Sequence, residues 1–514
     1  MDRQQDSLTA RRAGVLLHPT CLPGEGGIGS LGASARAFVD FLSASGLGWW
    51  QVLPLNPTGY GDSPYAAQSS FAGEPLLIDL AELAALGWVE PSELTYLEQV
   101  GQSDAIDFAA VRSAKLPLLE AAARRFLERA GGAERAGLDE FRARHVVWLE
   151  DFAAFSALKA HFDRRAVQQG VANSCWSRYW PASLAMRDAA DLAACRRRFA
   201  SEIDVCCVLQ YWFALQWRRL RQYAATAGVS IIGDLPIYVA EDSADVWSRP
   251  ELFQLDQRRR PTCVAGVPPD YYSDTGQLWG NPLYRWPAHR AEGFAWWTSR
   301  FAQAFECFDR VRIDHFRGFA ACWEVPAAAE TAEAGRWMAS PGRALLQTVA
   351  DRLGRLPLIA ENLGVITADV EVLRHDFELP GMVLLQGAFD EKEDRRTAFL
   401  PHNHERNSVV YTGTHDNDTT RGWYEKRSAG ERQALAAYRG APLEQPTWDL
   451  IRMVWASVAE TAIVPLTDLL DLGSEARFNT PARAEGNWRW RAPANYAERG
   501  LVPRLRRLNE IFGR

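Results

Sequence analysis

Three acidic residues, each placed at or just beyond the end of a short apolar run, are the best candidates for chemistry in this chain. They are Asp314, Glu361 and Asp416. A charged side chain at the end of a buried strand costs free energy unless it is paired or used. If the three runs are strands that end on one face, their acids share a pocket. Carboxylates that differ in protonation can cleave or form glycosidic bonds.

Arg312 lies two residues before Asp314, so a strand would turn both side chains to the same face. A guanidinium beside a carboxylate favours its ionised form, which a carboxylate nucleophile requires. The pattern therefore predicts that Arg312 keeps Asp314 ionised at neutral pH. The alternative is a structural ion pair that fills the interior, because such pairs also perturb pKa values.

Glu361 emerges from an apolar run, so partial desolvation should raise its pKa. A raised pKa suits a general acid that works near pH 7. The alternative is a glutamate that caps a helix or pairs with an arginine. Residues 415–418, His-Asp-Asn-Asp, could bond sugar hydroxyls through His415 and Asp416, or could form a turn, which Asp and Asn favour.

A metal site is the rival interpretation of the same residues, since His315, His415 and the aspartates could ligate a divalent cation. However, Asp314 and His315 are neighbours and would point to opposite faces of a strand. No His-x-His pair follows the first apolar run, and serine nucleophile and phosphate-loop patterns are absent from the sequence. We therefore expect no metal and no other cofactor.

Eight short β-like runs are present along the chain, and helical patterns such as residues 343–353 separate several of them. The runs are residues 15–17, 50–55, 230–235, 311–314, 358–361, 382–386, 409–412 and 463–466. This alternation predicts an α/β fold, a (β/α)8 TIM barrel, with the acids at the carboxyl ends of its strands, where barrel enzymes place their active sites.

The spacing of the runs is uneven and predicts large inserted subdomains after strands 2 and 3. Apolar recurrence of helical period over residues 115–130, 150–161 and 189–220 predicts a mainly helical insertion at 70–205. Residues 236–305 are rich in Pro, Gly, Tyr and Trp and predict a loop-rich insertion that covers the active site. The chain, 1–514, is expected to be a single catalytic barrel domain.

Composition and charge narrow the class of protein and its compartment. The net charge is −7, and no basic stretch resembles a nucleic-acid footprint, so we expect no nucleic-acid partner. The eight cysteines form no Cys-x-x-Cys pair and are expected to be reduced. Residues 13–17 are too short for a signal peptide or membrane span, which predicts a cytoplasmic protein without a membrane partner. The 20 tryptophans are either core or platforms for sugar rings.

Taken together, the motifs resemble those of the 4-alpha-glucanotransferases, the amylomaltases and disproportionating enzymes of glycoside hydrolase family 77 in the α-amylase clan. The matching segments run nearly end to end. They are residues 59–65, 71–73, 233–239, 266–271, 276–284, 312–318 and 412–419.

The resemblance implies a role for each matching residue. Asp314 would be the nucleophile, Glu361 the general acid/base and Asp416 the stabiliser of the transition state. Residues implied in substrate binding are Tyr65, Asp234, Asp270, Trp279, Arg312, His415 and Asn479, with Asp390 a looser match. The chain departs from the family pattern at Glu74 and at residues 66–68, near the acceptor side, which bears on chain-length preference and not on the chemistry.

The implied reaction moves a segment of an α-1,4-glucan to the 4-hydroxyl of another glucan or of glucose, by a retaining double displacement through a covalent glucosyl-enzyme. The implied partners are maltooligosaccharides, amylose or glycogen-derived glucans, with glucose as an acceptor, and the expected state is a monomer or homodimer. Three alternatives stay open: a hydrolase of the same clan, a non-catalytic glucan-binding protein and a metal hydrolase.

Overall fold

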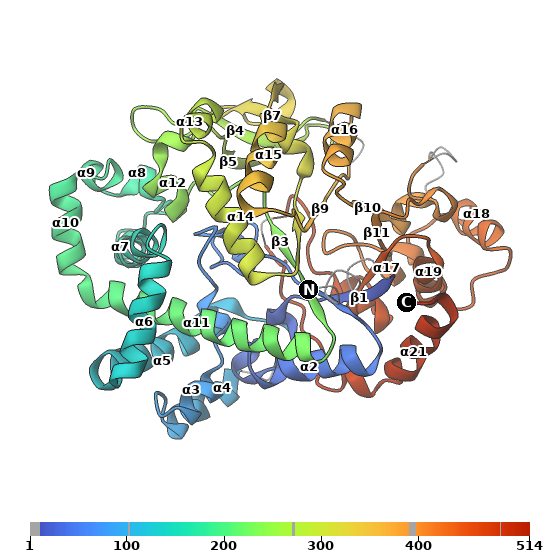
Figure 1. The fold of residues 1–514 in the computed structure, drawn as a ribbon, viewed down its shortest axis with the longest axis horizontal. Coiled ribbons are helices and arrows are strands. Elements are labelled where there is room, and N and C mark those ends of the chain that lie inside the picture. The colour runs from blue at the N-terminus through green and yellow to red at the C-terminus, as the bar shows by residue number, and fades with distance from the viewer. Residues whose placement is uncertain (1–10, 101–102, 270–272, 390–396, 484) are drawn as a thin grey trace.

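Eight parallel strands close into a barrel in the order β1-β12-β11-β10-β9-β6-β3-β2 (Figure 1). The structure is a computed structural model that describes residues 11–100, 103–269, 273–389, 397–483 and 485–514. The barrel strands are β1 Arg12–Leu16, β2 Trp49–Gln51, β3 Ser230–Leu235, β6 Arg310–Ile313, β9 Leu358–Ala360, β10 Gly381–Leu384, β11 Ser408–Tyr411 and β12 Thr461–Pro465. Each overlaps one of the eight predicted runs, which confirms the predicted TIM barrel.

The barrel strands are apolar on both faces because helices cover the outside and side chains fill the inside. Every residue of β9, β10, β11 and β12 is buried. Gly14 in β1 permits a close approach, since a Cβ there would lie 2.3 Å from the Trp49 carbonyl oxygen of β2. The alternation of strand and helix therefore delivers eight carboxyl ends to one rim.

A long helical segment separates β2 from β3 and lies beside the barrel (Figure 1). Its helices are α3 Leu80–Ala85, α4 Pro91–Val100, α5 Phe108–Arg129, α6 Gly132–Arg144, α7 Leu149–Gln168, α8 Trp176–Tyr179, α9 Ala182–Ala185, α10 Ala189–Arg198 and α11 Ala200–Thr226. Helix α11 contacts both α7 of this segment and barrel strand β3, so it joins the two parts. The limits 70–205 for an inserted subdomain stay a prediction.

A second sheet, which the sequence did not predict, is antiparallel and has the order β5-β4-β7-β8. Its strands are β4 Cys263–Val267, β5 Gln277–Pro282, β7 Ala321–Pro326 and β8 Arg336–Ala339. Two come from the segment after β3 and two from the segment after β6. The strands were missed because Gly and Pro interrupt them and because β5 and β8 are largely exposed, which removes a periodic apolar signal.

The remaining helices surround the barrel and the second sheet (Figure 1). They are α2 Ala33–Ala44, α12 Ala244–Ser248, α13 Trp286–Ala291, α14 Ala295–Cys307, α15 Gly342–Leu353, α16 Ala368–Asp376, α17 Thr420–Glu425, α18 Ala429–Arg439, α19 Pro446–Ala456, α20 Leu466–Leu469 and α21 Leu501–Phe512. Helix α15 confirms the pattern at residues 343–353 and buries Leu345, Leu346 and Val349. In the described part of the chain, no helix has the length and apolarity needed to cross a membrane.

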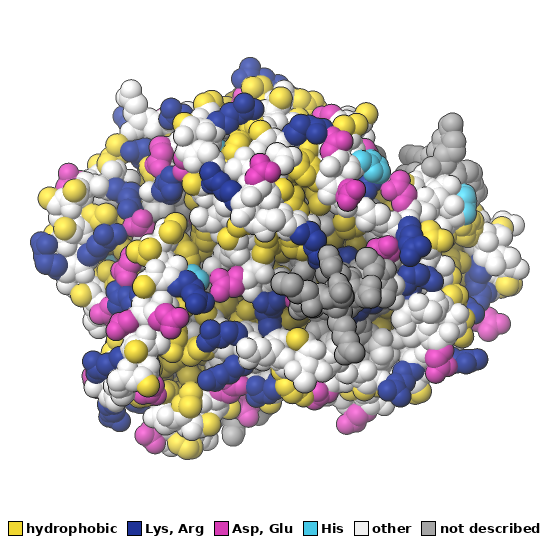
Figure 2. Space-filling view, in the orientation of Figure 1, with side chains coloured by type: hydrophobic (Ala, Val, Ile, Leu, Met, Phe, Trp, Pro, Cys, Tyr) yellow, Lys and Arg dark blue, Asp and Glu magenta, His cyan; other side chains and the backbone are white. Residues whose placement is uncertain are grey.

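Most tryptophans of the described chain are core residues. Six tryptophans are among the largest fully buried side chains: Trp49, Trp50, Trp176, Trp247, Trp297 and Trp455. Among the tryptophans of the described chain, only Trp279 and Trp337 are exposed. On the face in Figure 2, basic and acidic side chains are interspersed, as on an ordinary solvated surface.

Candidate active site

A buried arginine joins two acids at the carboxyl ends of β3 and β6. Asp234 and Arg312 are register partners on these neighbouring strands. Arg312 Nη1 donates to both Asp234 oxygens at 2.9 and 2.7 Å, and Nη2 donates to Asp314 Oδ1 at 3.0 Å. The side chains of Arg312 and Asp234 are 4% and 0% exposed, whereas Asp314 is 27% exposed. The predicted common face of Arg312 and Asp314 is confirmed.

The pKa of Asp314 is set by opposing effects. Burial raises its pKa, the neighbouring Arg312 charge lowers it, and the Asp416 charge raises it again. The net direction is upward because desolvation is the largest effect, and the expectation that Arg312 keeps Asp314 ionised at neutral pH stays a prediction. Arg312 nevertheless supplies a cation in direct contact with the carboxylate, and it is what favours the ionised form.

Glu361 follows β9 directly and is held by backbone groups. Its Oε2 accepts the His315 N–H at 2.6 Å and its Oε1 accepts the Leu363 N–H at 3.1 Å. His315 adopts a left-handed backbone with φ of 47° in the turn after β6, and this turn presents its N–H to Glu361. Burial raises the pKa of Glu361 to about 8, although the Arg312 charge opposes the rise. The carboxyl group is therefore largely protonated at neutral pH, as its apolar approach predicted.

Asp416 lies in a turn that begins shortly after β11. Asn417 Oδ1 accepts the Thr414 N–H at 2.8 Å, so the turn interpretation of this segment is correct. The Asp416 carboxylate is also fixed, because Asn479 Nδ2 donates to its Oδ1 at 2.6 Å. Its side chain is 44% exposed. Arg477 also donates to the Asp416 carbonyl oxygen. The turn thus leaves the Asp416 carboxylate accessible as a hydrogen-bond acceptor for solvent or a bound ligand.

One aromatic wall of the site is built by Tyr65, His415 and Trp488. The Tyr65 hydroxyl donates to Asp234 Oδ2 at 2.8 Å, and its ring stacks on His415 with centroids 5.1 Å apart. Trp488 lies 5.9 Å from both rings. Burial lowers the pKa of His415 to about 4, so its imidazole is neutral at pH 7. Trp488 was missed because it belongs to no periodic run.

A second aromatic wall lies on the Glu361 side and comes from the antiparallel sheet. Trp279 of β5 packs edge-to-face on His315 with centroids 4.8 Å apart, and its ring lies 6.1 Å from that of Tyr238. Burial lowers the pKa of His315 to about 4. Tyr238 was not singled out, although it lies in the 233–239 motif. Two of the residues suggested by resemblance, Asp270 and Asp390, lie outside the described residues.

The two histidines considered for a metal site are parts of different walls, His415 beside Tyr65 and His315 beside Trp279. In the described chain, no group of three or more His, Cys, Asp or Glu side chains is arranged to hold a metal ion.

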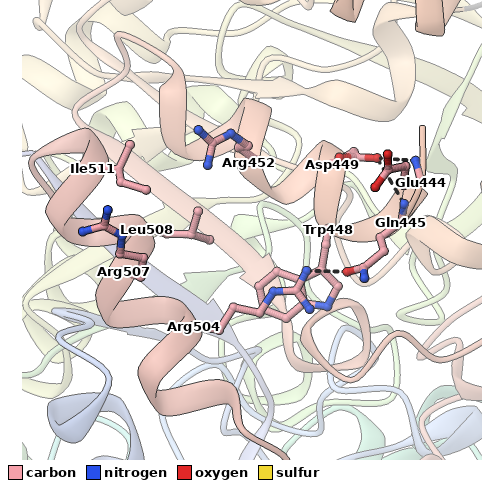
Figure 3. A pocket seen from close by; sticks show the side chains of 9 residues that line it. All are labelled: Glu444, Gln445, Trp448, Asp449, Arg452, Arg504, Arg507, Leu508 and Ile511. Carbon is pink, nitrogen blue, oxygen red and sulfur yellow. Dashed lines mark hydrogen bonds between the residues drawn. The ribbon is translucent and has the colours of Figure 1, made fainter. Parts of the chain in front are cut away.

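An open pocket of about 380 Å³ lies away from these residues, between α19 and α21 (Figure 3). It is lined by Glu444, Gln445, Trp448, Asp449, Arg452, Arg504, Arg507, Leu508 and Ile511. None of the predicted site residues contributes to it.

Three acids thus lie at or just beyond the carboxyl ends of the barrel strands. Asp314 is bound by Arg312, Glu361 is protonated near pH 7, and Asp416 is partly exposed to solvent. Ile313 and Ala360, the residues just before Asp314 and Glu361, are register partners on β6 and β9. Such a pair of acids, with aromatic walls on both sides, fits acid/base chemistry on a sugar.

Known proteins are similar to this chain over nearly its whole length. The sequence pattern of the family described as 4-alpha-glucanotransferase, glycoside hydrolase 77, matches residues 17–495. The 4-alpha-glucanotransferase of Thermus thermophilus is 48% identical over 94% of each chain. The chloroplastic/amyloplastic enzyme of Arabidopsis thaliana is 42% identical over 99% of this chain and 87% of its own. Because some relatives are plastid proteins, a cytoplasmic location stays a prediction.

Solved structures agree with the sequence comparison. The amylomaltase from Streptococcus agalactiae in complex with acarbose superposes with a TM-score of 0.92, at 37% identity, and covers 98% of this chain and 99% of its own. The amylomaltase from Corynebacterium glutamicum, 18% identical, shares the fold with a TM-score of 0.78 over 99% of this chain and 76% of its own. Sequence and fold together assign this protein to glycoside hydrolase family 77, the 4-alpha-glucanotransferases.

Proposed function

We propose that this enzyme transfers α-1,4-glucan segments by a retaining double displacement, with Asp314 as the nucleophile and Glu361 as the general acid/base. The observation that carries the proposal is the contrast between two acids at matching positions on neighbouring strands. One is bound by Arg312 and the other is protonated near pH 7. Neighbouring strands lie about 4.8 Å apart, which is close to the carboxyl separation of about 5–5.5 Å in retaining enzymes.

In the first step, Glu361 donates its proton to the glycosidic oxygen while an Asp314 oxygen attacks the anomeric carbon. The bond between this carbon and the leaving glucan breaks, and the carbon is bound to Asp314 with inverted configuration. The leaving glucan departs with a new hydroxyl group. Glu361 is now ionised, and this change of charge prepares it to act as a base.

In the second step, the 4-hydroxyl of an acceptor glucan or glucose attacks the same carbon and loses its proton to Glu361. The bond to Asp314 breaks, a new α-1,4 bond forms, and two inversions give net retention. Asp416 accepts hydrogen bonds from the 2- and 3-hydroxyls of the reacting sugar. These bonds accelerate the reaction if they are stronger in the transition state than in the ground state.

The remaining predicted residues bind substrate around this centre. Asp234, Arg312 and His415 hold the reacting sugar, with Tyr65 closing one side and Trp279 the other. Asn479 orients Asp416 through its 2.6 Å hydrogen bond. Acarbose in the Streptococcus agalactiae neighbour supports an oligosaccharide ligand. The aromatic walls favour transfer because they exclude water from the glucosyl-enzyme while an acceptor enters.

The test is to incubate the purified enzyme with maltotriose and to separate the products by chromatography. Glucose together with a ladder of chains longer than maltotriose is the expected result. Release of glucose and maltose without longer chains would indicate a hydrolase, and no reaction with retained affinity would indicate a glucan-binding protein. Addition of a chelator should leave the rate unchanged, and a loss of rate would favour the metal hydrolase.

A further inference from the structure

The loop of residues 58–67, which carries Tyr65, is closed at its base by a buried carboxylate. Glu74 is 7% exposed. Its Oε2 accepts the Thr58 N–H at 2.9 Å and the Thr58 hydroxyl at 3.3 Å, and its Oε1 accepts the Leu76 N–H at 3.1 Å. Thr58 and Ala67 form an isolated antiparallel bridge that brings the two ends of the loop together. Glu74 therefore binds one of these two ends.

Arg112 of the helical segment binds the same loop at two points. Arg112 of α5 donates through Nη2 to the Thr58 hydroxyl at 2.9 Å, and its Nη1 lies 2.6 Å from Asp62 Oδ1. Thr58 therefore links the two charges, since its hydroxyl donates to Glu74 and accepts from Arg112. The result is a continuous series of hydrogen-bonded side chains from Glu74 through Thr58 and Arg112 to Asp62, three residues before Tyr65.

The hydrogen bonds around residue 74 require a carboxylate there. All three groups that contact the Glu74 oxygens are donors, and an ionised carboxylate only accepts. A side-chain amide would turn an N–H group toward at least one donor. Burial raises the pKa of Glu74, and the backbone donors of Thr58 and Leu76 together with the Arg112 charge oppose this rise.

We propose that Glu74 and Arg112 are positioning residues that clamp the Tyr65 loop, so that Tyr65 stays bonded to Asp234 and stacked on His415. The inference rests on the proposed function, because it assigns Tyr65 to the sugar-binding wall. Neither residue needs to touch the substrate. Glu74 departs from the usual family residue, yet its side chain is turned to the backbone of Thr58 and Leu76, so any effect on chain-length preference must act through the loop.

The experiment compares Glu74→Gln and Arg112→Ala with a matched control, Arg125→Ala. Arg125 lies on the same helix and pairs with Glu93 at 2.6 Å, away from the Tyr65 loop. The KM and kcat for maltotriose and the ratio of hydrolysis to transfer are measured for each variant. We expect Glu74→Gln to raise KM about tenfold with little change in kcat, because it breaks hydrogen bonds to a charged group. Arg112→Ala should raise KM about threefold, since its ion pair is partly exposed.

Two further measurements separate positioning from a general structural role. In a Tyr65→Phe background, Glu74→Gln should have lost most of its effect on KM, because both changes act on the same contact. Undiminished effects in that background, or a lower melting temperature with unchanged KM, would overturn the clamp. Arg112→Ala alters a partly exposed side chain, so it provides the same kinetic test if Glu74→Gln does not fold.

Acarbose affinity, measured by calorimetry, distinguishes failure of the clamp from failure of the proposed function. We expect about tenfold weaker binding by Glu74→Gln and unchanged binding by Arg125→Ala. If the natural enzyme elongates maltotriose but the clamp variants bind acarbose normally, the clamp is wrong and the function stands. Weaker acarbose binding by the clamp variants of a protein that elongates nothing would support the clamp and reject the transferase mechanism.

Discussion

The barrel mouth is the region at the carboxyl ends of the barrel strands that holds Arg312, Asp314 and Glu361. This region and the outer pocket between α19 and α21 both place arginines beside acids and aromatic rings, yet their physical settings differ. At the mouth, the paired side chains of Arg312 and Asp234 are 4% and 0% exposed. Arg507, which lines the outer pocket, pairs with Glu510, and these two side chains are 72% and 66% exposed. Figure 3 shows the outer arginines spread around an open space, whereas Arg312 makes three hydrogen bonds to two acids.

The proposed catalytic centre is thus not the region with the more open arginines, and open volume and arginine content are poor guides to it. Water screens the exposed pair, so such a pair contributes little to stability or to pKa values. Burial at the mouth raises the pKa of Glu361 and strengthens the interaction of Arg312 with its two acids. The differences in protonation that acid/base chemistry needs are found where water is excluded.

The largest effect is expected for Asp314→Asn, which removes the proposed nucleophile and keeps the shape of the side chain. The kcat for maltotriose disproportionation should fall by about 10⁴-fold or more, as for other essential catalytic groups. A melting curve close to that of the natural enzyme would show that the fold is kept. Substantial remaining transfer would refute the assignment of Asp314.

Arg312→Ala should come next, because it leaves the buried Asp234 and the partly buried Asp314 without their cation. We expect a loss of about 3–5 kcal/mol in the free energy of unfolding and a fall of about 10³-fold in kcat. Since Arg312 lowers the pKa of Asp314, its removal should also move the acidic limb of the kcat/KM profile to higher pH. Arg374→Ala is the matched control, because Arg374 is also 4% exposed and pairs with Glu371. It should lose stability and keep the pH profile.

The pH profile of kcat/KM should have a basic limb near pH 8, set by Glu361. A general acid must be protonated, so activity is present below this pKa and falls about tenfold for each pH unit above it. Initial rates at low maltotriose concentration between pH 5 and about 10 would measure this limb. A profile that stays flat above pH 8 would contradict the role of Glu361 as the proton donor.

The smallest effect is expected for Arg504→Ala in the outer pocket. Arg504 lies 3.6 Å from the Trp448 ring centroid and donates to Gln445, so its loss should cost at most about 1 kcal/mol of stability. The kcat and KM should stay within about twofold of the natural values. A large kinetic change would mean that the outer pocket is coupled to the barrel mouth, and the contrast between the two regions would fail.

Sequence patterns predicted the barrel strands well because their signal is local. Parallel strands buried on both faces are short apolar runs, and residues such as Ile231 and Val410 report this directly. The antiparallel sheet was missed, because β5 exposes Trp279 and Leu278 and has no such run. Trp488 was missed for the same reason, since only the folded chain brings it beside Tyr65 and His415.

The sequence by itself determined the barrel, the acids at its strand ends and the common face of Arg312 and Asp314, since strand periodicity and the order of residues carry that information. Only the tertiary structure decided that burial outweighs Arg312 in its effect on the Asp314 pKa and that Glu74 is turned to the Tyr65 loop. These features depend on solvent exclusion and on contacts between distant segments. The spacing of neighbouring residues predicts neither solvent exclusion nor contacts between distant segments.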